Sequence, residues 1–96
     1  MAHYVSVTLV VKDQQKLEDY FKVGGPAVAK HGGKPFAGGP ETKVLQQANH
    51  PTRGVVLEFS TAQQVEDWLN DPELAEVHAL RDAAADVTIL SLPEMP

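Results

Sequence analysis

Three ionisable residues, His31, Glu58 and Arg81, are the side chains of this chain best suited to chemistry. Glu58 lies near the centre of the run Arg-Gly-Val-Val-Leu-Glu-Phe-Ser, which otherwise has the composition of a buried β-strand. A carboxylate taken out of water without a partner costs several kcal/mol, so Glu58 predicts either a solvated cavity face or a nearby cation. An ion pair with Arg53 or Lys12 on the sheet is the structural alternative.

The helical periodicity around His31 and Arg81 predicts that both side chains point toward the interior. At about 100° per residue, His31 continues the stripe of Tyr20 and Val28 on one predicted helix. Arg81 lies at the edge of the apolar side of another helix, beside Val77. The structural alternatives are a contact with the helix dipole for His31 and a buried stem with a solvated guanidinium for Arg81. Both residues are candidates for a site assembled from different elements.

Two further residues complete the candidate set. Trp68 is expected to pack in the core with Val65 and Leu69, and lining a pocket is the alternative for its ring. Arg53 opens the strand that carries Glu58 and is included as a ligand-binding candidate. The candidate ligand-binding residues are His31, Arg53, Glu58, Trp68 and Arg81, of which His31, Glu58 and Arg81 are also candidates for catalysis.

The composition limits the classes of protein to which the chain can belong. Its 96 residues have room for one domain, taken as residues 1–96. No apolar run approaches the ~20 residues of a membrane span, and the net charge of −5 opposes a nucleic-acid partner. The lack of cysteine excludes disulfides, the four histidines show no metal-ligand spacing, and no cofactor is expected. The N-terminus has no signal-peptide pattern, so we expect a cytoplasmic location.

The hydrophobic period switches from two to 3.6 and back, which predicts the element order β-α-β-β-α-β. The first half is predicted to contain a strand at 4–11, a helix from an Asp13 cap to about His31 with a kink or short break at Pro26, a strand at 34–37 and an extended piece at 42–47. The second half is predicted to contain a loop at 49–52, a strand at 53–59, a helix opened by a capping box at Thr61, a helical restart from Asp71 to Ala84 and a strand at 87–92.

This order predicts an α+β, ferredoxin-like subunit, in which helices cover one face of a four-stranded antiparallel sheet. The other face would expose Tyr4, Val10, Val56 and Leu90, an apolar patch that monomers rarely tolerate. A second copy of the chain is the simplest cover. Packing of two such sheets face to face gives a homodimer, a dimeric α+β barrel, with Glu58 lining the space between the sheets.

The same residues carry a resemblance to a known family. His31-Gly32-Gly33, Pro51-Thr52-Arg53, Glu58-Phe59, Trp68, Pro72-Glu73 and Arg81 resemble the bacterial family described as domain of unknown function 1330, within the dimeric α+β barrel superfamily. The resemblance covers almost the whole chain and implies a homodimer with a cleft beside the sheet, and no established reaction. The chain departs from the family at Leu69 and Leu74, where an aromatic residue and a tyrosine are usual, and at Gln46-Gln47, where Glu-Gly is usual. The loss of these polar groups argues against catalysis.

Three functions from different classes remain open. The first is a homodimer that binds a small organic ligand in the cleft, or serves a structural or regulatory role. The alternative is a cofactor-independent enzyme, similar to monooxygenases and isomerases of the superfamily, with His31 as acid or base, Arg81 as anion clamp and Glu58 as orienting group. The third is another βαββαβ protein, such as an acylphosphatase or an RNA-recognition module. The first strand is followed by no glycine-rich phosphate loop, and the third strand offers one arginine and one phenylalanine.

Overall fold

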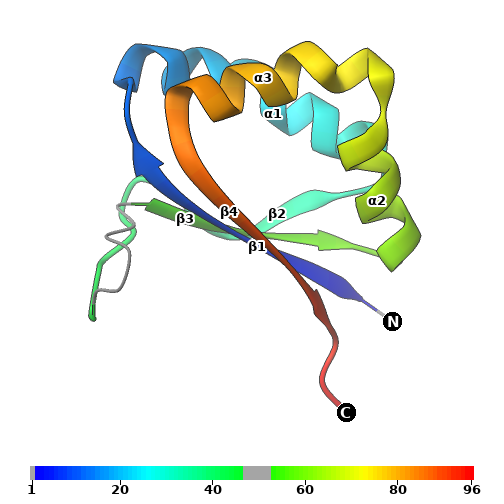
Figure 1. Ribbon diagram of the computed structural model, residues 1–96. Coiled ribbons are helices and arrows are strands. Elements are labelled where there is room, and N and C mark those ends of the chain that lie inside the picture. Colours follow the sequence, from blue (N-terminus) through cyan, green and yellow to red (C-terminus); the bar gives the residue numbers. More distant parts are fainter. Residues whose placement is uncertain (1, 47–52) are drawn as a thin grey trace.

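The computed structural model describes residues 2–46 and 53–96, and its elements follow the predicted order (Figure 1). They are β1 (His3–Val11), α1 (Gln14–Lys30), β2 (Lys34–Gly38), β3 (Arg53–Phe59), α2 (Ala62–Asn70), the 3-10 helix η1 (Pro72–Leu74), α3 (Ala75–Ala84) and β4 (Ala85–Pro93). Residues 42–46, predicted to be extended, form no strand. The predicted loop at 49–52 and the last residue of the extended piece, Gln47, lie outside the described residues.

The ends of α1 follow from the residues that flank it. The Asp13 side chain accepts a hydrogen bond from the Lys16 backbone N–H at 3.1 Å, which confirms the predicted N-cap. Gly32 follows the helix with a φ of 79°, a left-handed conformation that glycine adopts without steric cost. The helix is continuous through Pro26, so the predicted break is absent. Pro26 is exposed, and water can solvate the carbonyl that its ring leaves without an N–H partner.

The second helical region is divided at Asp71. The Thr61 hydroxyl accepts from the Gln64 N–H at 3.2 Å, and the Gln64 side chain accepts from the Thr61 N–H at 3.2 Å, which is the predicted capping box. Asp71 then accepts from the Glu73 N–H at 2.9 Å, with Pro72 in the first position of η1. The predicted restart at Asp71 is therefore confirmed, with a 3-10 first turn.

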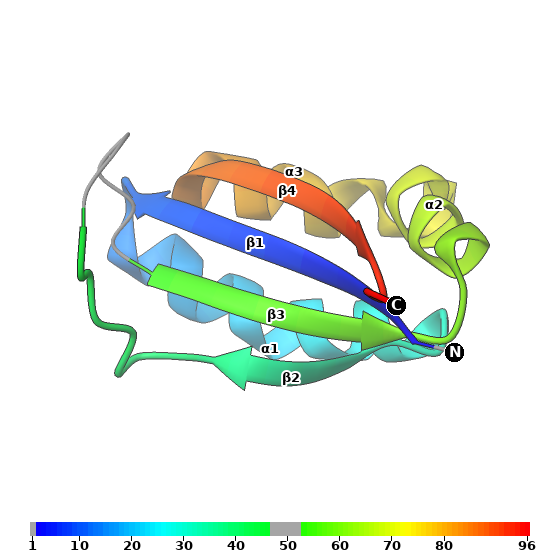
Figure 2. The same ribbon diagram turned by 90° about the horizontal axis from the view of Figure 1, so that it is seen from below.

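The four strands form one antiparallel sheet in the order β2-β3-β1-β4. All the helices lie on one side of it, above the strands in Figure 1 and behind them in Figure 2. Val5 is opposite Leu57 and Tyr4 is opposite Glu58 in the register of β1 and β3, so Val5 and Leu57 face the helices while Tyr4 and Glu58 face away. This arrangement confirms the predicted α+β, ferredoxin-like fold class.

The core fills the space between the helices and the sheet. Its largest fully buried side chains are Trp68, Phe59, Leu17 and Val5. The Trp68 ring packs against Phe59, with centroids 5.7 Å apart, so its predicted place in the core is confirmed. Leu69, predicted to pack beside it, is 37% exposed. Successive residues of a helix point about 100° apart, so Leu69 points away from the core when Trp68 points into it.

The face of the sheet away from the helices, here called the open face, carries the predicted apolar patch. Leu90 is 53% exposed and Leu92 is 40% exposed. The Tyr4 ring contacts Phe36 of β2 with centroids 5.4 Å apart. No helix of the described residues covers this face (Figure 1). The apolar side chains of the open face are Tyr4, Val10, Phe36, Val56, Leu90 and Leu92.

Candidate ligand-binding site

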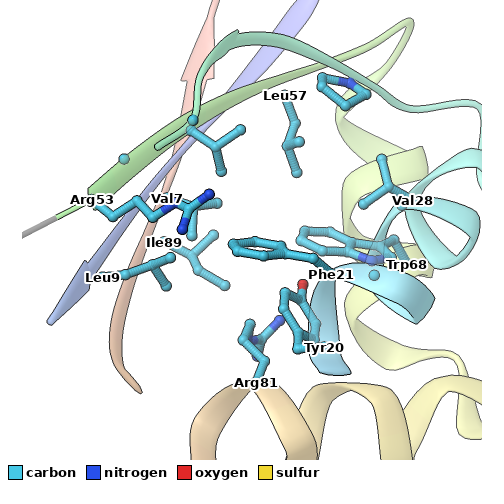
Figure 3. Close-up of a pocket in the computed structure, with 16 residues that line it drawn as sticks. Val7, Leu9, Tyr20, Phe21, Val28, Arg53, Leu57, Trp68, Arg81 and Ile89 are labelled. Atoms are coloured by element: carbon cyan, nitrogen blue, oxygen red, sulfur yellow. The ribbon is translucent and has the colours of Figure 1, made fainter. Parts of the chain in front are cut away.

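A cavity of about 280 Å³ lies between the helices and the sheet (Figure 3). Its sheet wall is aliphatic and includes Val7, Leu9, Val55, Leu57 and Ile89. The facing wall belongs to α1 and consists of Tyr20, Phe21, Gly24, Gly25 and Val28. The helices α2 and α3 contribute Trp68 and Arg81, and β3 contributes Arg53. An apolar cavity with a few polar groups is the usual form of a small-molecule site.

Gly24 allows the Tyr20 ring to lie against the backbone of α1. A Cβ at position 24 would lie 2.8 Å from Cζ of Tyr20, which is closer than two unbonded carbon atoms can approach. The Tyr20 ring therefore fills the space that a side chain at position 24 would occupy. Its hydroxyl is directed into the cavity (Figure 3). Tyr20 was not among the predicted site residues, and its signal in the sequence is the i, i+4 spacing of a tyrosine and a glycine.

Arg81 is the buried cation of the cavity. It is 7% exposed, which confirms the prediction that it points inward. Its Nε donates to Asp82 Oδ1 at 3.1 Å, and its Nη1 donates to His78 Nδ1 at 3.3 Å. His78 Nε2 lies 2.9 Å from the Trp68 carbonyl oxygen. Since a guanidinium only donates and a carbonyl only accepts, His78 carries its proton on Nε2 and accepts at Nδ1. These hydrogen bonds, to Asp82 and to His78 with its contact to Trp68, hold the Arg81 guanidinium in place.

Tyr20 and Arg81 present hydrogen-bond donors to the cavity. Burial raises the pKa of the Tyr20 hydroxyl and outweighs the nearby Arg81, which lowers it. The phenol is therefore neutral near pH 7. Arg81 lies near the phenol and its guanidinium can only donate hydrogen bonds, so the Tyr20 proton can be donated to another acceptor. The pair is suited to an anionic or carbonyl oxygen of a ligand.

Arg53 is a second cation on the cavity wall. Its guanidinium carbon lies 4.5 Å from the centroid of the Phe21 ring, a cation–π contact. Arg53 is half-buried, and no described acidic side chain lies within ion-pair distance of it. Of the described residues that line the cavity, none is an aspartate or a glutamate. The cavity therefore contains two arginines without a carboxylate among its lining residues.

Glu58 lies on the other side of the sheet from this cavity. Of the two predicted surroundings, a solvated cavity face or a nearby cation, Glu58 has the cation, but the predicted partners Arg53 and Lys12 are wrong: Glu58 pairs with Lys34 at 3.2 Å. The register of β2 and β3 places Lys34 directly opposite Glu58. Arg53 instead lies over Phe21, and Lys12 pairs with Asp86 at 3.3 Å. Glu58 also helps to raise the pKa of Tyr4, after the effect of desolvation.

His31 belongs to a cluster of charges at the end of α1. Its Nε2 lies 2.8 Å from Asp71 Oδ2, and Lys30 Nζ lies 2.7 Å from both the Asp71 and Glu73 carboxylates. Hydrogen bonds from Lys30 and then His31 hold the pKa of Asp71 well below its usual range. His31 does not line the cavity. Of the predicted site residues, Arg53, Trp68 and Arg81 share the cavity, whereas His31 and Glu58 lie elsewhere.

No three histidine, aspartate or glutamate side chains of residues 2–46 and 53–96 are grouped so that they could hold a metal ion. No helix in the same ranges combines the length and the apolar character that a membrane crossing requires.

The fold and the cavity define a ferredoxin-like α+β protein with a small, mostly apolar pocket between its layers. A sequence model of the family described as domain of unknown function (DUF1330) matches residues 2–95. The chain belongs to this family. Among curated proteins, none matches the sequence at a significant level.

Solved structures share the fold at low sequence identity. A protein of unknown function from Rhodopseudomonas palustris has a TM-score of 0.79 at 18% identity, with 99% of this chain and 84% of that chain covered. A dimeric ferredoxin-like protein of unknown function from Jannaschia sp. CCS1 has a TM-score of 0.77 at 13% identity, with 98% and 100% covered. A dabb family protein with a ferredoxin-like fold from Mesorhizobium loti has a TM-score of 0.70 at 10% identity, with 99% and 98% covered. These likenesses show the fold and not an activity.

Proposed function

We propose that this protein is a homodimer that binds a small organic anion in the cavity between α1 and the sheet. One observation carries the proposal: Arg81, 7% exposed, is placed at an apolar cavity of about 280 Å³ beside the neutral hydroxyl of Tyr20. A buried charge is costly unless it is paired, and the partner of Arg81 is Asp82, whose side chain is 62% exposed. A bound carboxylate would add a charge-assisted hydrogen bond to Arg81 from inside the cavity.

The apolar walls of the cavity indicate the chemical character of the uncharged part of the ligand. The aliphatic sheet wall and the rings of Phe21 and Trp68 favour a hydrocarbon body, whose burial contributes about 25 cal/mol per Å². A dry cavity of roughly 150 Å³ can hold a single benzene ring, so a cavity of about 280 Å³ suits a medium-length chain or two fused rings. In this proposal Arg81 and Tyr20 bind the anionic group, and Trp68 contacts the hydrocarbon.

The open face supports the dimer. Its apolar side chains, with Leu90 53% exposed, are the kind of surface that a second copy covers. The Jannaschia protein, which has the same fold, is described as dimeric, and so is a ferredoxin-like protein from Thermobifida fusca. We place Glu58, with Lys34, in the space between the two sheets, away from the ligand. His31 then has a structural role at the end of α1.

Thermal unfolding with matched probes tests the proposal. Octanoate and 2-naphthoate should raise the melting temperature of the wild-type protein, whereas octanamide and 2-naphthamide, which lack the charge, should not. A probe at 100 times its Kd stabilises the folded state by about 2.7 kcal/mol. Arg81→Leu and Tyr20→Phe should each weaken the effect of the carboxylates. Equal stabilisation by acids and amides, or none by any probe at millimolar concentration, would overturn the proposal.

A cofactor-independent enzyme is the second candidate, and Tyr20 is the observation that favours it. A neutral phenol with a raised pKa beside a guanidinium can stabilise an oxyanion that forms in a reaction. Such an enzyme also needs a base, and no histidine or carboxylate of the described residues lines the cavity. Turnover of any member of a metabolite panel, abolished by Tyr20→Phe with the fold intact, would favour this candidate over simple binding.

A further inference from the structure

The two arginines of the cavity differ in origin and in their present partners. Arg81 comes from α3 and is bound by Asp82 and His78, while Arg53 comes from the first position of β3 and lies over Phe21. Figure 3 shows both side chains directed toward the same space, one from the sheet and one from the helices. Two like charges that share one cavity repel each other, and this repulsion grows where the walls exclude water.

From this arrangement we infer that the ligand carries two acidic groups, one at each end of an apolar segment, with Arg81 and Arg53 each binding one of them. The inference rests on the proposed function and adds the number of charges to it. A ligand with a single acid would satisfy Arg81 and leave Arg53 with only the Phe21 ring among the described residues. The 16 described residues that line the cavity include no carboxylate that could pair with Arg53.

The cavity wall between the two arginines is apolar, so the part of the ligand between its two acidic groups should be hydrocarbon. Leu9 is opposite Arg53 in the sheet, and Ile89 of β4 lies beside it on the same wall. Phe21 lies on the other side of this path, with its ring against the Arg53 guanidinium. Hydrocarbon between two acids would therefore contact apolar surface, while each acid meets a guanidinium that can donate two parallel hydrogen bonds. The ligand class is a medium-chain dicarboxylate or a molecule with the same charge pattern.

The two sites are expected to contribute unequally. Arg81 is buried and prearranged by His78, whereas Arg53 is half-buried and closer to water. An ion pair with a partly exposed arginine is screened, so the second acid should add a modest factor to the affinity.

Calorimetry with acids of equal chain length tests the inference. The probes are hexanoate, octanoate and decanoate, each compared with the dicarboxylate of the same length. In the wild-type protein we expect the dicarboxylate of at least one length to bind about fivefold more tightly than its monoacid, the factor for a partly exposed ion pair. Arg53→Gln should reduce this ratio to about one, and Arg53→Lys, which keeps the charge, should retain part of it. Lys16→Gln, which removes an exposed charge outside the cavity, should leave the ratio unchanged.

The outcomes separate this inference from the proposed function. Binding of monoacids with no preference for a dicarboxylate at any length would overturn the inference and leave the proposed function standing. A preference that persists in Arg53→Gln would also overturn it, because the second acid would then bind elsewhere. Failure of every acid to bind would remove both.

Discussion

Glu58 and Arg81 lie on opposite sides of the sheet. Glu58 is opposite Tyr4 in the β1–β3 register and faces away from the helices, whereas Arg81 lies on α3 beside the cavity on the helix side. The two residues therefore cannot act on one ligand within a single subunit. The cavity proposed to bind the ligand and the open face proposed to pair with a second copy are therefore separate, so each can be altered without the other.

The first prediction is that Glu58→Gln leaves octanoate affinity within about twofold of wild type, whereas Arg81→Gln weakens it by about 10- to 100-fold. The second factor corresponds to the roughly 1.5–3 kcal/mol of a hydrogen bond to a charged group. Isothermal calorimetry on both variants measures the affinities. Glu58→Gln also removes the pair with Lys34, whose side chain is 68% exposed, so the free energy of unfolding should fall by no more than about 1 kcal/mol. An octanoate affinity that depends on Glu58 would contradict the placement of the ligand.

The second prediction concerns the open face. Leu90→Asp should dissociate the dimer, because a twofold interface loses the leucine twice and each buried leucine contributes about 1.5–3 kcal/mol. Sedimentation equilibrium should then give a mass near 10.4 kDa in place of about twice that value. Leu69→Asp is the matched control, since Leu69 lies on α2, away from the open face, and should leave the dimer intact. A wild-type protein that is monomeric at high micromolar concentration would remove this interface.

The sequence predicts the fold better than the site, and Glu58 and Tyr20 show why. Hydrophobic periodicity is local, so the strands, the Asp13 and Thr61 caps and the inward direction of Arg81 follow from residues a few positions apart. The partner of Glu58 is not local. It depends on the register between β2 and β3, which brings Lys34 beside it instead of Arg53.

The sequence does not single out Tyr20 as a site residue, for a different reason. Its position on the apolar stripe of α1 could be read from the sequence, but a tyrosine there is usually a core residue. The role proposed for Tyr20 depends on the absent side chain at Gly24 and on the approach of Arg81 from α3. Neither contact is visible before the helices are packed. The same stripe predicts an inward His31, but the His31 ring instead contacts Asp71, which a separate segment of the chain brings to the end of α1.

The third prediction is a pH dependence of stability at Asp71. The pKa of its carboxyl is lower in the folded protein than the ordinary value of 3.8, first because of Lys30 and then because of His31. A lowered folded pKa means that the stabilisation is complete above the unfolded pKa and is lost as the pH falls below about 4. The melting temperature of wild type should therefore fall more steeply below pH 4 than that of Asp71→Asn, which keeps an N-cap.

Lys30, the partner of Asp71, gives a second check at the alkaline end of the pH range. The Asp71 and Glu73 carboxylates raise its pKa above the ordinary 10.5, so its contribution is complete below that value and is lost as the pH rises through the folded pKa. Lys30→Gln should flatten the alkaline limb of the melting-temperature profile and Asp71→Asn the acid limb. Profiles parallel to wild type in both variants would show that the cluster contributes nothing to stability.

The last prediction tests the support that Gly24 gives to Tyr20. In Gly24→Ala the new methyl group would lie 2.8 Å from Cζ of Tyr20, so the ring must move and its hydroxyl is displaced from its present place in the cavity. Octanoate affinity should fall about tenfold, as expected for loss of a hydrogen bond to the ligand charge. The free energy of unfolding should change by less than about 1 kcal/mol, because alanine is the better helix former. Gly25→Ala is the control: it adds a methyl group to the same wall, with no atom within 4 Å, and should leave the affinity nearly unchanged. Equal affinities in wild type and Gly24→Ala would show that the Tyr20 hydroxyl does not contact the ligand.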